Sequence, residues 1–500
     1  MFGSQTTRFF FIPLSLTFLF AGVVSAAPKV VISSPPNNSA QNSKVHFIAS
    51  ASSAQCSRGI SQMRVYPQEH VAAVSVNSAK LDTNVTLSPG SYSVVVQAWD
   101  VCGNSGSAIV MITVANPNLV PAKFLFAAQP SSNHIIGFRV NSSTGALTPT
   151  AQGAVATGRN PIFLASDNDG FRLYAANQDS QTLSAYFIYR NDGFLHPVPG
   201  SPVAVSGTPN YVAVHPSGKF VYVSAAQENG GGKITALSVH SDGSLHSIPG
   251  SPYSTVHPLS TVVVDPNGEY LYASSSEAAD EYQDEYRIDR STGELTPLPG
   301  EPHDVRLPNQ YDCNDLCGGG TNEMTSDIGG KFLFAPLFGS GSIAVFDISH
   351  STGQLMDARK SPFIDQLPNS PTSPGASPTS VAVDANGRFV YTNGCICGED
   401  FFSTYIQQWQ LFSSSGTLVK ANRFFDPTVC EEKSLRADSS GKFLYALAEI
   451  ACDPDSGIPT SNSLPTILVF STANGNISMT SGSPFIQKAG AQFSSIAVTR

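Results

Sequence analysis

Charged residues interrupt two segments whose counterparts elsewhere in the chain are small or apolar. One reads Asn322-Glu-Met-Thr-Ser-Asp327 and the other Glu431-Glu-Lys-Ser-Leu-Arg-Ala-Asp438, whereas a counterpart such as Val381-Ala-Val383 carries no charge. An arginine or lysine can hold a carboxylate, and a glutamate can move a proton in acid–base catalysis. The candidate ligand-binding residues are therefore Asn322, Glu323, Lys433 and Arg436. Of these, Glu323 and Arg436 are also candidate catalytic residues.

The same charges have a structural interpretation. Charge placed against apolar walls must be paired or functional, because an isolated ion is costly to remove from water. Arg436 stands where other segments have alanine, at positions 165, 213 and 382. A buried pair of Arg436 with Glu323 or Glu432 is the favoured interpretation, and a ligand-binding role remains open beside it.

The elements that must position these residues come from a repeat. Seven short aromatic-rich segments recur at intervals of about 50 residues, which is typical of four-stranded propeller blades. They are Lys123-Phe-Leu-Phe126, Phe171-Arg-Leu-Tyr174, Lys219-Phe-Val-Tyr222, Glu269-Tyr-Leu-Tyr272, Lys331-Phe-Leu-Phe334, Arg388-Phe-Val-Tyr391 and Lys442-Phe-Leu-Tyr445. Each predicts the second strand of one blade, and the charged segments precede two of them as first strands, which line the central channel.

The two ends of the repeat complete each other. Blade 1 begins at its second strand, while the chain ends on Phe493-Ser-Ser-Ile-Ala-Val-Thr499, a first strand with nothing after it. We therefore expect a seven-bladed β-propeller closed by the C-terminal strand. Pro-Gly-Ser-Pro sequences such as Pro199–Pro202 and Pro249–Pro252 predict outer edges, since an edge strand can spare a backbone donor.

Three histidines fall in expected loops on one face of the propeller. Connections between second and third strands, and between blades, emerge on this face, which we call the top. His134, His257 and His303 are candidate ligand-binding residues there, and His257 is the third candidate catalytic residue. Ordinary surface roles are the simpler interpretation of each.

The eight cysteines predict disulfides rather than a metal site, because the chain has features of an exported protein. Cys56 and Cys102 follow two strands at one end of the N-terminal domain and are expected to pair. The other six are assigned to top-face loops over blades 4 to 7, where disulfides would staple them. These are Cys313, Cys317, Cys395, Cys397, Cys430 and Cys452.

The sequence Glu277-Ala-Ala-Asp-Glu-Tyr-Gln-Asp-Glu285 is the most acidic segment of the chain. Several carboxylates in one loop can hold calcium, but the spacing of an EF-hand is missing. A solvated acidic loop is the favoured interpretation. No cofactor is expected.

The N-terminal residues predict two further parts. Arg8, the apolar run after it and Val24-Ser25-Ala26 indicate a signal peptide over residues 1–26, and therefore a secreted or periplasmic protein with no membrane span after cleavage. Seven short strand candidates in residues 28–114, with Trp99 expected in the interior, predict a β-sandwich. Residues 115–120 form a linker, and residues 121–500 the propeller.

Composition limits the partners. The formal net charge is -10 with only 13% charged residues, so the surface would repel phosphate backbones and nucleic acid is a poor partner.

Two families resemble parts of the chain. Segment Leu87–Asp100 is similar to the late strands of bacterial immunoglobulin-like modules. From about residue 121 to 500, first-strand motifs such as Pro209-Asn-Tyr-Val-Ala-Val-His-Pro-Ser-Gly218 and Pro378-Thr-Ser-Val-Ala-Val-Asp-Ala-Asn-Gly387 resemble the seven-bladed propeller lactonases, which include 6-phosphogluconolactonases. In catalytic members of that family a Pro-His pair commonly opens a first strand. The matching positions here hold Ile162, Asn210, Ser260, Asn322, Thr379, Lys433 and Ser494.

The resemblance leaves two functional classes. As an enzyme the protein would open a lactone with water, whereas as a binding or scaffold module it would present its top face to a carbohydrate, peptide or cell-envelope ligand. Export favours binding, because the phosphogluconolactone of sugar metabolism is intracellular.

Overall fold

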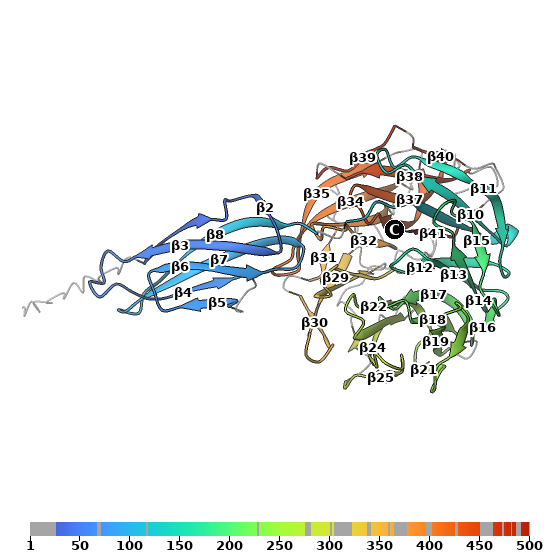
Figure 1. Cartoon of the computed structure of the whole chain (residues 1–500), viewed down its shortest axis with the longest axis horizontal. Helices are drawn as coiled ribbons and strands as arrows, with labels where there is room; N and C mark the ends of the chain where they lie inside the picture. Colours follow the sequence, from blue (N-terminus) through green and yellow to red (C-terminus); the bar gives the residue numbers. More distant parts are fainter. Residues whose placement is uncertain are drawn as a thin grey trace, which may run out of the picture.

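The computed structural model shows two all-β parts, an elongated sandwich and a ring of seven blades (Figure 1). Among the described residues, no helix is long and apolar enough to cross a bilayer. Residues 1–26, which were expected to form a signal peptide, lie outside the described residues. The structure describes residues 27–67, 72–116, 119–227, 230–275, 282–300, 303–304, 323–337, 342–358, 361–364, 378–396, 403–425, 429–450, 464–472, 475–481, 483–486 and 492–499.

Eight strands form the N-terminal part in two sheets. The first sheet has the order β1-β3-β6 and the second β2-β8-β7-β4-β5. Their bounds are β1 Lys29–Ser34, β2 Ser39–Gln41, β3 Lys44–Ser52, β4 Ile60–Tyr66, β5 Val74–Val76, β6 Lys80–Thr86, β7 Gly90–Asp100 and β8 Ser105–Val114.

Alternate residues of these strands fill one core between the sheets. Phe47, Met63, Val94 and Val96 are fully buried in it, as the period of two along a strand requires. The expectation that Trp99 is interior was wrong. It lies on the outer face of β7, where the Arg64 guanidinium covers its ring at 5.3 Å, because the inward positions of this strand are the even-numbered ones.

The first four sheets of the ring follow in chain order. Blade 1 contains β9 Phe124–Gln129, β10 His134–Val140 and β11 Leu147–Ala156, with a 3-10 turn at Pro130–Ser132. Blade 2 contains β12 Pro161–Ser166, β13 Arg172–Asn177, β14 Thr182–Ile188, β15 Leu195–Pro197 and β16 Val203–Ala204. Blade 3 contains β17 Thr208–Val214, β18 Phe220–Ala226, β19 Gly232–Val239, β20 Leu245–Ser247 and β21 Tyr253–Thr255. Blade 4 contains β22 Leu259–Val264, β23 Tyr270–Ser275, β24 Tyr282–Ile288, β25 Leu295–Pro297 and β26 His303–Asp304.

Three more sheets complete the ring. Blade 5 contains β27 Thr325–Ser326, β28 Phe332–Leu337, β29 Ser342–Ile348, β30 Leu355–Asp357 and β31 Phe363–Ile364. Blade 6 contains β32 Val381–Val383, β33 Phe389–Ile396, β34 Ser403–Phe412 and β35 Thr417–Phe425. Blade 7 contains β36 Val429–Ala437, β37 Phe443–Ile450, β38 Leu464–Ser471, β39 Ser478–Met479 and β40 Phe485–Ile486.

The expected closure of the ring is confirmed. The last strand, β41 (Ser495–Val498), pairs antiparallel with β9 of blade 1. Ile496 and Phe493 are buried in the same core cluster as Tyr445 and Val469 of blade 7. The C-terminal strand therefore joins blade 1 to blade 7 through backbone pairing and apolar packing.

The outer edge of most blades is split, which differs from a simple four-stranded blade. In blade 3, β20 and β21 both pair with β19, one after the other. Between them the Pro-Gly-Ser-Pro turn interrupts the ladder, and the hydroxyl of Ser251 accepts a hydrogen bond from the Ala236 backbone at 2.9 Å. Ser201, Ser361 and Ser483 do the same in blades 2, 5 and 7. The serine thus satisfies a backbone donor that the interrupted strand leaves unpaired.

The repeated aromatic residue joins neighbouring blades. The Tyr222 hydroxyl donates to the Gly293 carbonyl of the next blade at 3.0 Å, and Tyr272 donates to Gly353 at 2.8 Å. Tyr445 of blade 7 reaches Gly145 of blade 1 in the same manner. The tyrosines therefore connect each of these blade pairs through a buried polar contact.

Candidate functional site

The first strands place one residue of each blade in a layer around the channel. In blades 2 to 7 this residue lies four positions before the residue that opens the turn to the second strand. The seven residues of this layer are Ser495, Phe163, Tyr211, Thr261, Glu323, Ser380 and Ser434. Two positions later on each strand, the side chains are small except in blade 7, with Ala497, Ala165, Ala213, Val263, Thr325 and Ala382 opposite Arg436.

Both oxygens of the Glu323 carboxylate are occupied. Arg436 donates two hydrogen bonds to them, at 2.6 and 3.1 Å. Ser380 adds a hydroxyl donor at 2.7 Å, and Ser434 lies at 3.2 and 3.3 Å from the two oxygens. Because only 3% of the Glu323 side chain is exposed, these partners replace the water that it has lost. The structure thus contains one of the two pairs left open above, the one with Glu323.

Arg436 crosses the channel. It starts in blade 7, bonds Glu323 in blade 5, and lies 5.4 Å over the ring of Phe163 in blade 2. Both partners are two blades away along the ring, in opposite directions, so the guanidinium must pass near the channel axis. The six small residues of its layer leave the room for it. Burial alone would lower the pKa of Arg436, but the charge of Glu323 opposes it and the pKa lies above its ordinary value.

An aromatic pair lies beside this ion pair. Phe163 and Tyr211 stack with ring centroids 3.6 Å apart. Burial raises the pKa of the Tyr211 phenol, the charge of Glu323 raises it further, and Arg436 and Thr261 partly offset the rise. The Thr261 hydroxyl is fully buried and makes no hydrogen bond of normal geometry among the described residues. Apolar rings, a paired charge and hydroxyls therefore share one layer of the channel.

The remaining candidates of the charged segments are placed less completely. Lys433 lies in β36, next to a bulge between Glu432 and Ser434. The side chains of Lys433 and Glu432 are outside the described part of the chain, as is all of Asn322. Of the four ligand-binding candidates in these segments, the structure brings Glu323 and Arg436 together.

The three histidines do not converge on this layer. His134 begins β10, where it pairs with Gln129 and Ala156, so it lies in a strand and not in a loop. His303 is in strand β26, paired with Gln283, and its side chain is not among those described. His257 lies in the connection between blades 3 and 4, where its carbonyl accepts the Thr255 hydroxyl at 2.8 Å.

The acidic segment is partly a strand, which corrects the expectation of a solvated loop. Residues 276–281 lie outside the described residues, but Asp284 and Glu285 are in β24 with 8% and 2% exposure. Glu285 accepts the Leu355 backbone N–H at 3.3 Å. Burial raises the pKa of Asp284 to about 6, and the charge of His257 acts against that rise. The repeat was the available signal for a strand, because a third strand follows the second strand of the other blades at a similar distance.

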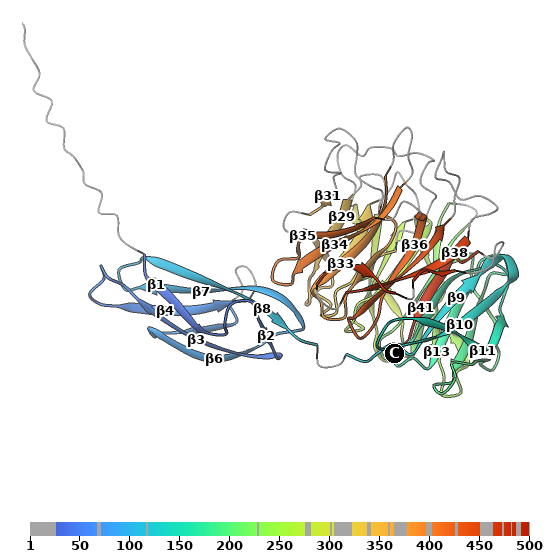
Figure 2. The ribbon, with the colours of Figure 1, turned by 90° about the horizontal axis from the view of Figure 1, so that it is seen from above.

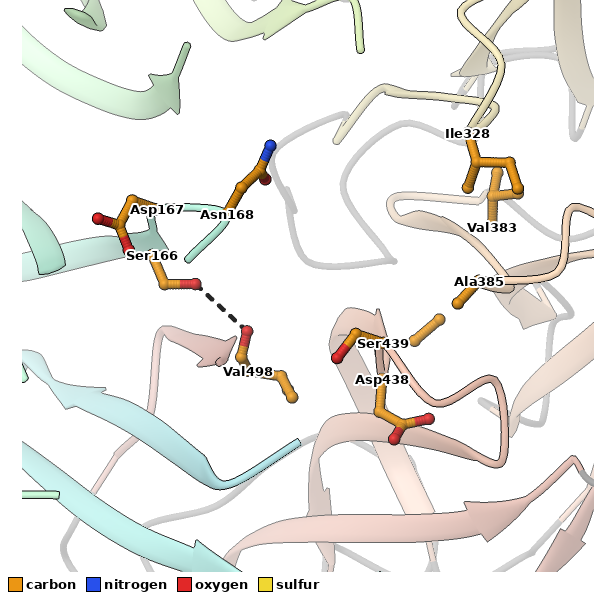
Figure 3. Close-up of a pocket in the computed structure, with 10 residues that line it drawn as sticks. Ser166, Asp167, Asn168, Ile328, Val383, Ala385, Asp438, Ser439 and Val498 are labelled. Carbon is orange, nitrogen blue, oxygen red and sulfur yellow. Dashed lines mark hydrogen bonds between the residues drawn. The ribbon is translucent and has the colours of Figure 1, made fainter. Parts of the chain in front are cut away.

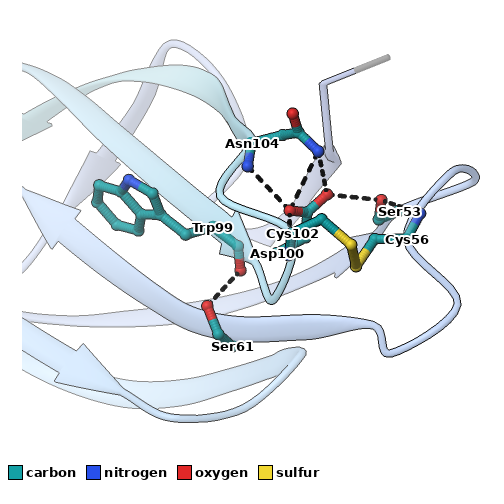
Figure 4. The surroundings of a disulfide bond; sticks show 7 residues. All are labelled: Ser53, Cys56, Ser61, Trp99, Asp100, Cys102 and Asn104. Carbon is teal, nitrogen blue, oxygen red and sulfur yellow. Dashed lines mark hydrogen bonds between the residues drawn. A yellow bond between two sulfur atoms is a disulfide. The ribbon is translucent and has the colours of Figure 1, made fainter. Parts of the chain in front are cut away.

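The expected Cys56–Cys102 bond is present (Figure 4). Beside it Asp100 accepts hydrogen bonds from Asn104, Ser53 and the Cys102 backbone, and these lower its pKa, the Asn104 side chain most. In the described parts of the chain these two cysteines and Asp100 are the one grouping with metal-ligand spacing. Because the two sulfurs are bonded to each other, the group is not a metal site.

Two of the six propeller cysteines are described, and both correct the expectation of loops. Cys395 is in β33, opposite Thr404, and Cys430 is in β36 at a bulge. The strands of blades 6 and 7 simply extend further toward the top face than the repeat suggests. Cys313, Cys317, Cys397 and Cys452 lie outside the described residues.

A cavity of about 210 Å³ lies at the other mouth of the channel, on the bottom face (Figure 3). Ser166, Asn168 and Ser439 give it a polar wall, and Ile328 gives it an apolar one. The Ser166 hydroxyl donates a hydrogen bond to the Val498 carbonyl at 3.3 Å. The Asp438 carboxylate accepts the backbone N–H groups of residues 442 and 443, so it serves the turn between first and second strands.

Known proteins match part of the chain in sequence and its propeller in fold. The model of the lactonase family, described as a seven-bladed β-propeller, matches residues 74–208 and 199–280. No curated protein matches the sequence significantly. Similar solved structures include a periplasmic gluconolactonase of Pseudomonas aeruginosa, with 18% identity, a TM-score of 0.56, and coverage of 75% of this chain and 99% of that one.

Two further similar structures are candidate 6-phosphogluconolactonases. The one from Bacteroides uniformis has 18% identity and a TM-score of 0.56, with 76% of this chain and 100% of that chain covered. The one from Bacteroides fragilis has 17% identity and a TM-score of 0.55, with 77% and 100% covered. At these identities the likeness shows the fold alone. The matched residues and the ring of seven blades together show a lactonase-like seven-bladed β-propeller fold.

Proposed function

We propose that the protein is a ligand-binding propeller of this family. It receives a neutral sugar-like ring in its channel from the top face and does not catalyse a reaction of that ring. The observation that carries the proposal is the saturation of Glu323. A general base must offer a free lone pair to the proton it removes, whereas both oxygens of Glu323 are engaged by Arg436, Ser380 and Ser434. The Glu323–Arg436 pair is therefore suited to fix the wall of the channel rather than to accept a proton.

The chemistry of the layer favours a neutral, polyhydroxylated ligand. The charges of Glu323 and Arg436 compensate each other, so a charged ligand gains little from either. Tyr211, which is partly exposed, adds aromatic surface to the layer, and an apolar ring face packs well on such a surface. The Thr261 hydroxyl, beside the Tyr211 phenol, adds a polar group of the kind that orients a ligand in a mostly apolar site. The gluconolactonase of Pseudomonas aeruginosa is named for a substrate of this shape, a cyclic sugar ester.

A lactone hydrolase is the second candidate, and Asp284 favours it. A carboxyl with a pKa of about 6, near His257, titrates close to the pH at which a general base works best. Asp284 lies in the third strand of its blade, however, two strands away from the channel wall. The saturated pair in the channel therefore supports binding more directly than Asp284 supports hydrolysis.

We propose that binding takes place outside the cytoplasm. The signal-peptide features of residues 1–26 and the Cys56–Cys102 disulfide both support export to an oxidising compartment. The low and acidic charge of the chain supports a partner other than nucleic acid.

The experiment measures binding and turnover on the same preparation of the mature chain. Glucose, gluconate and glucono-δ-lactone are tested by saturation-transfer NMR, and lactone opening is followed against the uncatalysed rate. We expect contact with the neutral rings and a lactone half-life equal to that of buffer. Tyr211→Leu and Thr261→Val should weaken contact about tenfold, a loss of about 1.4 kcal/mol, while Tyr189→Leu at an exposed position is the matched control.

Two results would contradict the proposal. Lactone opening faster than buffer, lost in Asp284→Asn, would establish the hydrolase. Absence of contact with every ring, or equal contact in Tyr211→Leu and the Tyr189→Leu control, would remove the channel layer as the binding site.

A further inference from the structure

The sandwich contacts the propeller at the bottom turns of blades 5 and 6 (Figures 1 and 2). The Ser413 backbone N–H donates to the Ser91 carbonyl at 2.7 Å, and the Ser91 N–H donates to the Ser413 hydroxyl at 3.1 Å. Ser91 is the second residue of β7, and Ser413 directly follows β34 of blade 6. The two domains thus exchange a reciprocal pair of backbone-centred hydrogen bonds.

Glycine is required on both sides of this contact. A Cβ added to Gly90 would lie 2.2 Å from the Ser413 hydroxyl oxygen, and the φ of Gly90 is +148°. A Cβ on Gly387 would lie 3.1 Å from the Pro89 carbonyl oxygen, with φ at +64°. Such a close approach of two backbones is possible because neither residue has a side chain.

Lys331 holds the turn that receives the sandwich. Its ammonium donates to the Ser413 and Ser414 carbonyls at 2.9 and 3.2 Å and lies 4.5 Å over the ring of Phe332. Burial lowers the pKa of Lys331 to about 8. A buried ammonium is costly, so its use here to fix two carbonyl groups indicates that this turn must keep one conformation.

The segment after β8 is attached to the same face. The Asn116 side chain donates to the Ala385 carbonyl at 2.8 Å, and Ser439 donates to the Val120 carbonyl at 2.6 Å. Ala385 and Ser439 also line the cavity at the bottom mouth of the channel. The sandwich and its connection therefore flank this mouth.

We infer that the bottom turns of blades 5 and 6 form a docking surface for residues 88–91 of the sandwich, which makes the two domains one rigid unit. Docking anchors the start of β7 and the segment that follows β8. The connection between the domains therefore does not act as a flexible tether.

A cysteine pair tests the docking. A Cβ on Gly329 would lie 3.6 Å from the Cβ of Ser88, within the range of disulfides. In the full chain carrying Ser88→Cys and Gly329→Cys, we expect the two introduced residues to form a bond on expression into an oxidising compartment, identified by peptide mass spectrometry. Ser88→Cys with Gly153→Cys is the control, because Gly153 on blade 1 has no neighbour within 4 Å.

Scattering provides the second arm. Gly90→Val should undock the sandwich, increase the radius of gyration of the full chain and abolish the cross-link in the Ser88→Cys/Gly329→Cys background, while the propeller keeps its melting transition. Gly103→Val is the matched control, since Gly103 also has positive φ but an open surrounding. The inference would be overturned if the Ser88→Cys/Gly329→Cys chain with Gly90 unchanged formed no cross-link. It would also be overturned if Gly90→Val and wild type had the same radius of gyration.

Discussion

Arg436→Met tests whether the channel pair supports the ring. The change keeps most of the side-chain volume and removes the charge, leaving a Glu323 carboxylate that is 3% exposed with only the hydroxyls of Ser380 and Ser434. Breaking a buried pair from one side costs about 3 to 5 kcal/mol. Unfolding entropy of about 2.1 cal/mol/K per residue gives ~0.8 kcal/mol/K for a propeller of about 380 residues, so the melting temperature should fall by about 4 to 6 °C.

Calorimetry at neutral pH checks this expectation. The matched control is Glu323→Gln/Arg436→Met, which removes both charges and should recover most of the lost stability. An Arg436→Met protein that melts with wild type at neutral pH would refute the reasoning, as would a deficit that the double variant shares in full.

Three further outcomes follow from the described contacts. Deletion of residues 493–500 should abolish the cooperative melting of the propeller in calorimetry, because blade 1 loses its first strand; a truncated chain that melts like the full one would overturn the closure. Asp284 has a folded pKa of about 6 against 3.8 unfolded, so its contribution to stability is present below pH 4 and is lost as the pH rises to 6; Asp284→Asn should remove this slope and be more stable by about 3 kcal/mol at pH 7.5 in urea titrations, and equal slopes would contradict the burial effect. Replacing Cys56 and Cys102 by serine should destabilise the sandwich by up to about 4 kcal/mol, given a closed loop with a separation of 46 residues, and free-thiol titration of the denatured wild-type chain should find this pair unreactive.

The sequence was sufficient for the ring because the repeat is local and periodic. Seven aromatic-rich segments at nearly equal intervals require seven equivalent sheets, and an unmatched strand at each end of the repeat requires closure. It also located Arg436, since a charge among alanines at equivalent positions is visible without coordinates. Partner choice was different. Glu323 and Glu432 were equal candidates on paper, and the decision depended on which strand lies across the channel from blade 7.

Other features depended on how far strands extend and which way their residues face. Cys395 and Cys430 were expected in loops but lie in strands, because pairing continues beyond the repeat. Trp99 was expected in a core and lies outside, because one position of register reverses the face of a side chain.

The sequence by itself determined the number of blades, their order and the position of the unusual charge, since these follow from periodicity and from departures from it. Only the tertiary structure decided that Arg436 crosses the channel to Glu323, and that Gly90 brings the sandwich against Ser413. Both contacts join residues that are far apart in the sequence. Arg436 and Glu323 are separated by 113 positions, and Ser91, which follows Gly90, is separated from Ser413 by 322. Their formation depends on the space left by neighbouring side chains, which no local pattern of residues encodes.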